Sequence, residues 1–173
     1  MHSVWKEVEE MKLEPIDLDV CQNLAKDLNE YDLFHNPTEL STWVYDPEMR
    51  HNCECFGIMV DNVIAGFVVL KDMNIDHSYL LWVSLHPEFR DGTIGAQATA
   101  AILEYAFVVK KAKMILSEVF IMNRKSMRLH HVLMSFRDRK KRLHGWKVAC
   151  FGMNQDRWIR NLQHFNRYLR RGK

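Results

Sequence analysis

Residues 78–107 read S-Y-L-L-W-V-S-L-H-P-E-F-R-D-G-T-I-G-A-Q-A-T-A-A-I-L-E-Y-A-F and contain three segments of different character. Residues 79–85 are apolar apart from one serine, which is typical of a buried strand. Residues 86–95 contain one proline and two glycines and therefore predict a turn. Residues 96–107 are rich in alanine and carry larger apolar residues at helical spacing, which predicts a helix.

A strand, a glycine-containing turn and a helix start together can form an anion site. The first amide groups of a helix have no partner within it, and the helix dipole adds partial positive charge there. Glycine lets the backbone approach a phosphate closely, and Arg90 adds a fixed charge. The fingerprints G-x-G-x-x-G and G-x-x-x-x-G-K-[ST] are both absent from the sequence. The stretch predicts a pyrophosphate site of another kind, and an ordinary strand–turn–helix is the alternative.

The segment L-H-P-E-F-R-D-G-T-I-G-A, residues 85–96, resembles the coenzyme A loop of the GNAT acetyltransferase superfamily. That loop typically reads V-x-P-x-x-R-G-x-G-x-G and opens a helix. The matching positions are Leu85, Pro87, Arg90, Ile94, Gly95 and Ala96. The chain departs from the pattern at Asp91 and Thr93, where the family usually has glycine. The resemblance implies acetyl-CoA as the cofactor, and the loop residues expected to hold it are Leu85, Arg90, Asp91, Gly92, Thr93, Ile94, Gly95 and Ala96.

The composition is that of a globular chain. The 173 residues, 47% hydrophobic and 27% charged, are enough for one domain with a substantial core. There is no run of 18 apolar residues, the N-terminus does not read as a signal peptide, and the four cysteines form no C-x-x-C pair. These features lead us to expect a reduced, cytoplasmic setting and no membrane partner.

The charge is divided unevenly along the chain. Residues 1–100 hold 6 basic and 18 acidic residues, whereas residues 101–173 hold 18 basic and 4 acidic residues. This asymmetry indicates a basic surface that could bind nucleic acid or another polyanion. Pairing of the two halves within one domain, or neutralisation of the coenzyme's phosphates, would explain the same pattern.

The order of predicted elements is that of an α+β protein with a mixed, mostly antiparallel sheet and helices on both faces. The same order occurs in the GNAT fold, over about residues 4–153, so we expect a GNAT-like domain in residues 1–153 and a basic amphipathic helix in residues 154–173. The predicted strands are 4–13, 53–60, 63–70, 79–85, 114–122, 135–141 and 146–153, and the predicted helices are 18–33, a short one from 37, 96–107, 126–133 and 155–171.

Residues 118–130, E-V-F-I-M-N-R-K-S-M-R-L-H, carry the candidate catalytic groups. A carboxylate within a β-rich apolar run is costly to bury, and its pKa rises toward the range of a general base. The segment resembles bacterial ribosomal-protein alanine acetyltransferases of the GNAT type, and similar phage proteins, which show E-V-x-x-x-N followed by x-x-A-x-x-L-Y. The resemblance implies that Glu118 is the base and that Asn123 contacts the coenzyme. A half-exposed edge-strand carboxylate is the alternative for Glu118.

The family's acid, a tyrosine, is replaced here by His130. A protonated histidine can donate to the leaving thiolate, although the neutral form is commoner at pH 7. The neighbouring His131 could compete for this role, and an ordinary surface histidine is the alternative. The predicted reaction is direct transfer of an acetyl group to an amine on a protein or small molecule. The Leu85 amide would polarise the acetyl carbonyl.

Several alternatives stay open from the sequence. One is acyl transfer to an amine bound to nucleic acid, and another is a non-catalytic, phage-like GNAT scaffold that binds a partner. The apolar face of the terminal helix could pack on its own domain or on a second copy, giving a homodimer. His51, Cys53 and Cys55 are metal-ligand types that would share a strand face, but no fourth ligand is evident and we expect no metal.

Overall fold

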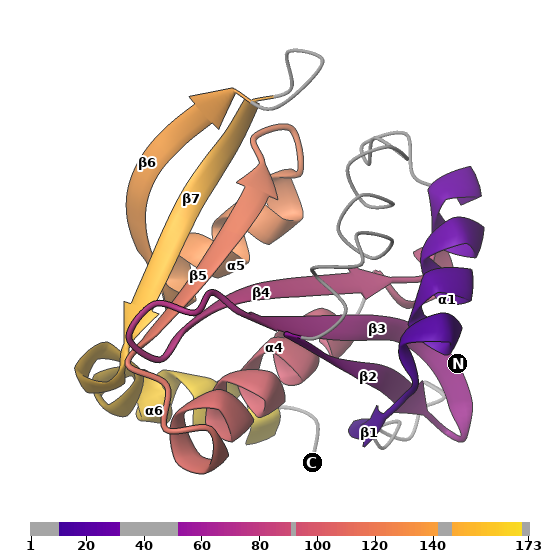
Figure 1. Cartoon of the computed structure of the whole chain (residues 1–173), viewed down its shortest axis with the longest axis horizontal. Helices are drawn as coiled ribbons and strands as arrows, with labels where there is room; N and C mark the ends of the chain where they lie inside the picture. The colour runs from indigo at the N-terminus through magenta and orange to yellow at the C-terminus, as the bar shows by residue number, and fades with distance from the viewer. Residues whose placement is uncertain (1–10, 32–51, 91–92, 142–146, 171–173) are drawn as a thin grey trace, which may run out of the picture.

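The computed structural model describes residues 11–31, 52–90, 93–141 and 147–170. Within these ranges, seven strands form one sheet in the order β1-β2-β3-β4-β5-β7-β6 (Figure 1). Only the β4–β5 pair is parallel among the described strands. The strands are β1 Met11–Pro15, β2 Cys53–Val60, β3 Val63–Asp72, β4 Ser78–Leu85, β5 Met114–Phe120, β6 Ser135–Lys141 and β7 Lys147–Asn154. The predicted α+β fold class, with a mixed and mostly antiparallel sheet, is confirmed.

Four α-helices connect and cover the described strands. They are α1 Leu18–Tyr31, α4 Ile94–Glu104, α5 Arg124–Leu133 and α6 Gln155–Arg170. A short 3-10 turn, η1 Pro87–Phe89, follows β4, and a π turn, η2 Tyr105–Val109, extends α4. Among the helices of the described ranges, none combines the length and the hydrophobicity of a membrane span.

Most predicted element boundaries agree with the structure to within two residues. The turn between β2 and β3 has positive φ at Asp61 (48°) and Asn62 (65°), as expected for a tight hairpin built from residues that tolerate this conformation. α4 and α5 each begin two residues before the predicted start, and β5 ends two residues before its predicted end. Part of the first predicted strand, the short helix from residue 37 and the loop at 142–146 lie outside the described residues.

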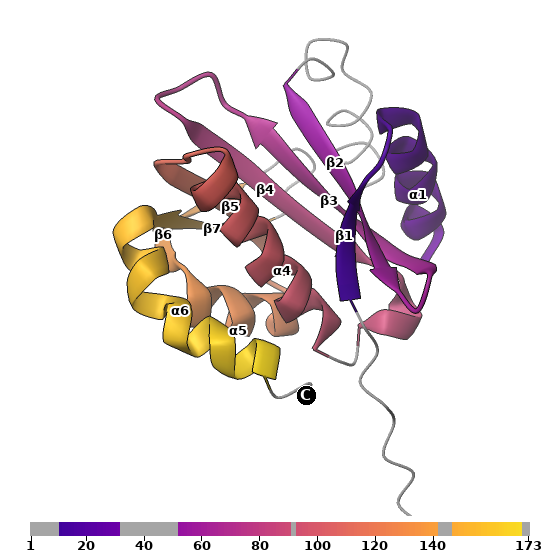
Figure 2. The same cartoon turned by 90° about the horizontal axis from the view of Figure 1, so that it is seen from below.

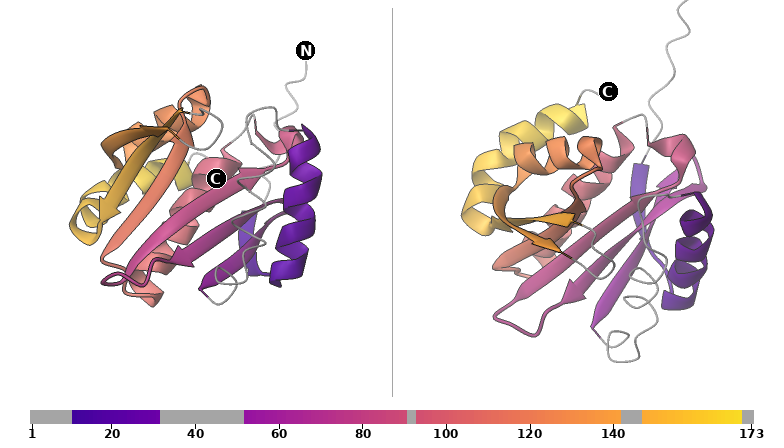
Figure 3. Two further views of the ribbon diagram at one scale, coloured as in Figure 1. Left: turned by 45° about the horizontal axis from the view of Figure 1, so that its top comes forward. Right: turned by 90° about the horizontal axis from the view of Figure 1, so that it is seen from above.

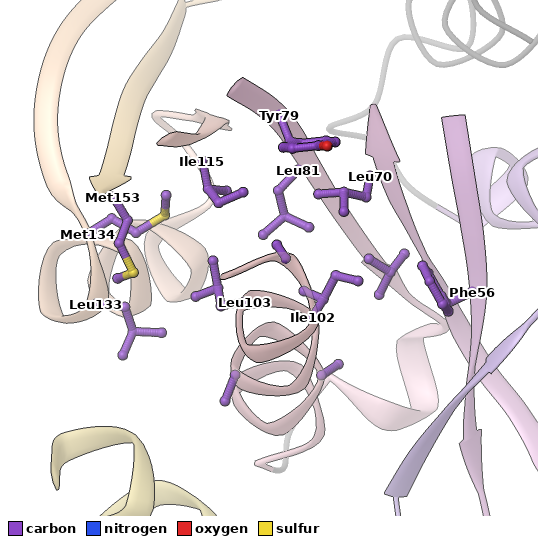
Figure 4. Packing of buried hydrophobic residues seen from close by; sticks show 14 of the residues in the cluster. Phe56, Leu70, Tyr79, Leu81, Ile102, Leu103, Ile115, Leu133, Met134 and Met153 are labelled. Atoms are coloured by element: carbon purple, nitrogen blue, oxygen red, sulfur yellow. The ribbon is translucent and has the colours of Figure 1, made fainter. Parts of the chain in front are cut away.

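The helices form layers on both faces of the sheet (Figure 2). α4, α5 and α6 lie on one face, where their apolar side chains share a core with alternate residues of β2, β3, β4, β5 and β7 (Figure 4). α1 lies on the other face and packs against β2 and β3 through a smaller cluster that includes Cys21, Cys55 and Phe67. We call these the α4 face and the α1 face. The residues of the candidate site are divided between these two faces.

The terminal helix packs on its own domain. The Trp158 ring of α6 is buried and stacks on Phe107, with 5.3 Å between ring centroids. The neighbouring Ile159 is 52% exposed, because the position next to Trp158 is rotated away around the helix.

β4 and β5 run side by side over half their length and then diverge (Figures 1 and 3). Their pairing runs from Ser78 opposite Met114 to Leu81 opposite Ser117. Residues 82–85 and 118–120 continue as strands, but no pairing joins them. The opening therefore lies at the carboxyl ends of two parallel strands, where open α/β sheets commonly bind ligands.

Gly66 allows β3 to approach the end of β4 closely. A register shift between Ile58 and Met59 adds a residue to β3 just before Gly66, which pairs with Leu85. A Cβ atom on Gly66 would overlap the carbonyl oxygen of Ser84 and lie 2.9 Å from the Leu85 Cα. This agrees with the bulge that an isolated strand glycine suggests.

Gly66→Ala is expected to destabilise the protein by about 1–3 kcal/mol, because backbone atoms of β4 would have to move. Urea denaturation measures the free energy of unfolding. Gly57→Ala is the matched control, since the nearest atom to a Cβ there would be in the Ile16 side chain, at 3.3 Å, and the nearest backbone atom, the Glu14 carbonyl oxygen, would lie at 3.9 Å. Equal losses in the two variants would contradict the close approach of β3 to β4.

Candidate active site

The start of α4 presents backbone amides that no side chain caps. Thr93, at the N-cap position, makes no capping hydrogen bond, and its hydroxyl instead accepts a hydrogen bond from the Gln97 side chain at 3.2 Å. The amides of Ile94, Gly95 and Ala96 belong to the first turn and have no intrahelical partner. This geometry fits an anion such as the diphosphate of a coenzyme.

Three predicted site residues meet where β4 ends. A Cβ atom on Gly95 would lie 3.3 Å from Leu85 Cδ1, so the first turn of α4 packs against the Leu85 side chain. The Arg90 Nε donates a hydrogen bond to the Leu85 carbonyl at 2.9 Å. This bond holds the guanidinium charge of Arg90 at the end of β4. Asp91 and Gly92, also predicted to contact the coenzyme, lie outside the described residues.

The Leu85 amide faces the opening. The next amide, of His86, donates to the Ala65 carbonyl of β3 at 2.7 Å. Successive amides in a strand point to opposite sides, so the Leu85 amide points away from β3 and toward the place that β5 has left. The predicted carbonyl-polarising donor therefore lies beside the first turn of α4.

Glu118 lies on β5 immediately after Ser117, the last residue of β5 that pairs with β4, and is partly buried. Side chains alternate along a strand, so Glu118 points to the α1 face whereas Ser117 points to the α4 face. Cys150 pairs with Glu118 on the adjacent strand β7, and its thiol donates a hydrogen bond to Glu118 Oε1 at 3.8 Å. The predicted base thus borders the opening from the face opposite α4.

Both ring nitrogens of His130 are hydrogen-bonded within the protein. The Ser126 carbonyl, 2.8 Å from Nδ1, can only accept, so Nδ1 carries the proton. Nε2 is then the acceptor, and it accepts a hydrogen bond from the Ser117 hydroxyl at 3.0 Å. Burial lowers the pKa of His130 to about 4; the bond to the Ser126 carbonyl opposes this shift, and the nearby His131 adds to it.

These contacts bear on the predicted acid role of His130. With a pKa of about 4, only about one ring in a thousand holds the second proton at pH 7. The acid role remains a prediction, and it requires the ring to take up a proton on Nε2 and lose the hydrogen bond from Ser117. His131 is exposed and packs edge-on against Phe151, with 5.1 Å between ring centroids.

The lowered pKa of His130 predicts a pH-dependent stability. Between pH 6.5 and about 4 the unfolded histidine takes up a proton that the folded ring does not, so the free energy of unfolding falls as pH falls. The loss attributable to His130 is about 2–3 kcal/mol at pH 4.5. Urea denaturation at pH 7 and pH 4.5 should show this loss in the wild type and in His131→Gln, but not in His130→Gln. An equal fall in the free energy of unfolding from pH 7 to pH 4.5 in His130→Gln and His131→Gln would contradict this assignment.

Asn123 caps α5. Its side-chain oxygen accepts a hydrogen bond from the Ser126 amide at 3.1 Å, and this cap explains why α5 starts at Arg124. The cap places Asn123 in the short connection from β5 to α5. Its predicted contact with the coenzyme stays a prediction.

Two side-chain contacts near the site were not predicted from the sequence. One involves Ser117, whose buried hydroxyl needs a partner, and that need was the available signal. The other involves Glu54 of β2, which accepts a hydrogen bond from the Tyr105 hydroxyl at 2.5 Å and pairs with Lys110. These contacts hold the end of α4 against the sheet.

The cysteines of β2 lie where strand alternation predicts. Cys53 and Cys55 share the α1 face, where they pack with Cys21 of α1. His51 lies outside the described residues. Within the part of the chain that the structure describes, no group of three or more His, Cys, Asp or Glu side chains is arranged so that it could hold a metal ion.

A family model described as the acetyltransferase (GNAT) family matches residues 18–136. The chain belongs to the GNAT acetyltransferase family. It is accordingly an N-acetyltransferase that moves an acetyl group from acetyl-CoA to an amine. The match covers β2 to β5, the opening and the start of α4, and so agrees with the site that the geometry outlines.

Solved structures show the same fold at low sequence identity. A spermidine N-acetyltransferase from Vibrio cholerae, in complex with CoA and spermine, is 18% identical, with a TM-score of 0.69 over 86% of this chain and 98% of that chain. A dodecameric structure of the Vibrio cholerae spermidine enzyme in an intermediate state is 17% identical, with a TM-score of 0.66 over 86% and 96% of the two chains. No curated protein gives a significant match.

Proposed function

We propose that this acetyltransferase carries out direct transfer in the opening between β4 and β5, and that its acceptor is a small cationic amine. The observation that carries the proposal is the divergence of the two strands between the uncapped start of α4 and Glu118. The α4 face would receive the coenzyme and the α1 face the acceptor, so the two would meet through the sheet.

The residues at the start of α4 fit the coenzyme. When bound, acetyl-CoA supplies an acyl group activated as a thioester. The amides of Ile94, Gly95 and Ala96 would hold its diphosphate, because no side chain caps them, and Arg90 would add charge beside them. Thr93, Asp91 and Gly92 belong to the same loop, and Asn123 would contact the coenzyme from the start of α5.

Glu118 would remove a proton from the acceptor. A primary amine has a pKa of about 10.4 and cannot attack while it is protonated. A carboxylate that borders the opening from the α1 face can accept this proton directly or through water. The Leu85 amide would hold the acyl oxygen from the other side, and no residue needs to form a covalent bond to the acyl group.

A cationic acceptor is supported by acidic residues at α1. Asp17, Asp19 and Asp27 of the α1 segment are exposed. Residues 1–100, the part of the sequence that contains α1, hold 18 acidic against 6 basic residues. An acidic surface attracts and orients polycations. The structural neighbours from Vibrio cholerae are spermidine N-acetyltransferases, which supports the same acceptor class. The nucleic acid partner and the homodimer stay predictions, and no comparison supports nucleic acid.

The experiment compares acceptors that share a reactive amine but differ in charge. Thiol release from acetyl-CoA is measured with spermidine and with butylamine. We expect kcat/KM for spermidine to exceed that for butylamine by about tenfold or more, since added charges interact with the acidic face. Equal values would overturn the cationic acceptor while leaving the transferase activity intact. No transfer to any amine by coenzyme-saturated protein would overturn the proposed site.

A further inference from the structure

A cavity of about 210 Å³ lies at the end of the sheet where β5 and β6 begin and β7 ends. Met114, the first residue of β5, lines it, so it lies at the opposite end of this strand from the opening. Arg137 of β6 and Arg157 and Arg160 of α6 also line it, and no acidic residue does. The proposed transfer reaction does not use this cavity.

The three guanidinium groups have no carboxylate partner in the described part of the chain. The Arg137 Nη1 donates only to the Met114 sulfur, a weak acceptor, at 3.5 Å. The Arg157 Nη2 donates to the Met134 carbonyl at 3.1 Å, while its Nε is buried without a hydrogen-bond acceptor. Among the described contacts, Arg160 makes no hydrogen bond or ion pair, not even with Asp156 one turn earlier. Three like charges around one cavity repel each other, and an anion would relieve this repulsion.

The cavity depends on a glycine. A Cβ atom on Gly152 of β7 would lie 2.7 Å from the Arg137 Cδ and 3.1 Å from its Nη1, so only glycine lets this side chain lie across β7. Arg137 itself occupies a register shift between Phe136 and Asp138. The bulge and the glycine together place one guanidinium over the cavity, and β-bulges often orient side chains beside functional sites in this way.

The start of α6 adds partial positive charge to the same place. Asn154, the last residue of β7, lines the cavity, and its side-chain oxygen accepts a hydrogen bond from the Arg157 amide at 2.9 Å. Arg157 and Arg160 therefore project from the first two turns of α6, where the helix dipole also favours an anion.

We propose that this cavity binds a small phosphate-bearing anion through Arg137, Arg157 and Arg160. Guanidinium groups match the oxygens of a phosphoryl group with paired hydrogen bonds. The volume of about 210 Å³ is below the range of about 300–1,000 Å³ that holds drug-sized ligands, so the anion is the size of pyrophosphate or of one end of a larger metabolite. The site is separate from the start of α4, which the coenzyme would occupy.

The test is a calorimetric titration of pyrophosphate into the full chain and four variants. Arg160→Gln removes an exposed charge at the cavity, and Gly152→Ala displaces Arg137. Arg128→Gln removes an exposed charge on α5 away from the cavity, and Ala96→Asp places a negative charge at the start of α4. We expect both cavity variants to weaken pyrophosphate binding by about tenfold or more, because each loses a charge-assisted contact. Arg128→Gln and Ala96→Asp should leave this binding event unchanged.

Three outcomes would overturn the proposal. Binding that Ala96→Asp abolishes and Arg160→Gln preserves would assign the pyrophosphate to the start of α4. Equal weakening by Arg128→Gln and Arg160→Gln would indicate general surface charge. Absence of pyrophosphate binding, together with retention of a single-stranded oligonucleotide that Arg160→Gln weakens, would assign these arginines to a nucleic acid surface. None of these results depends on acetyl transfer, so the proposed function is tested separately.

Discussion

Replacing Glu118 by glutamine is expected to lower the turnover number by about 10²–10⁴-fold, the range typical of losing a general base. The amide cannot accept the proton that the amine must lose, while its size and its place beside Cys150 stay nearly the same. The affinity for acetyl-CoA should not change, because Glu118 lies on the opposite face from the start of α4. Steady-state kinetics at saturating acetyl-CoA and calorimetry of the coenzyme measure the two quantities.

The pH profile and a matched control separate the base role from a structural one. A neutral amine needs no base, so the deficit of Glu118→Gln should narrow as the pH rises toward the pKa of the acceptor, near 10.4. Glu104→Gln makes the same chemical change at an exposed position of α4 and should keep full turnover. Unchanged turnover in Glu118→Gln, or an equal deficit in both variants, would remove Glu118 from this role.

Ala96→Asp is expected to weaken acetyl-CoA binding by about 10–100-fold, because a carboxylate would stand beside the phosphates. An acidic residue in the first turn favours the helix itself, so the loss could not be assigned to unfolding of α4. Calorimetric titration gives the dissociation constant, and thermal unfolding gives the stability of each variant.

Ala96→Asn is the control, since asparagine has nearly the same shape without the charge. We expect its affinity to stay within a few-fold of the wild type, and its melting temperature to match that of Ala96→Asp within a few degrees. Equal affinity of the aspartate and asparagine variants would place the phosphates elsewhere.

Local patterns in the sequence predicted most of the fold. The apolar run before Pro87, the two glycines after it and the alanine-rich segment beyond determine a strand, a turn and a helix without help from the rest of the chain. The hairpin at Asp61 and Asn62 was equally predictable, because these residue types tolerate positive φ. The boundaries were less so, since caps such as Asn123 depend on side-chain geometry.

Contacts between distant segments were not predictable. No local pattern indicates that Ser117 meets His130 across 13 residues, or that burial keeps the ring neutral by lowering its pKa. The cavity between β6, β7 and α6 depends on a bulge at Arg137 that meets a glycine 15 residues later. Such pairs follow from the register of the sheet, which the sequence alone does not determine uniquely.

Binding of the coenzyme at the start of α4 can be followed through the backbone amides of protein labelled with ¹⁵N-glycine, of which the chain has seven. Addition of acetyl-CoA should shift the Gly95 amide, at the start of α4, much more than those of Gly57 in β2 and Gly152 at the arginine cavity. Gly95→Ala identifies the signal. If the Gly95 amide resonance does not shift at saturating coenzyme while the Gly152 resonance does, the coenzyme does not bind at the start of α4.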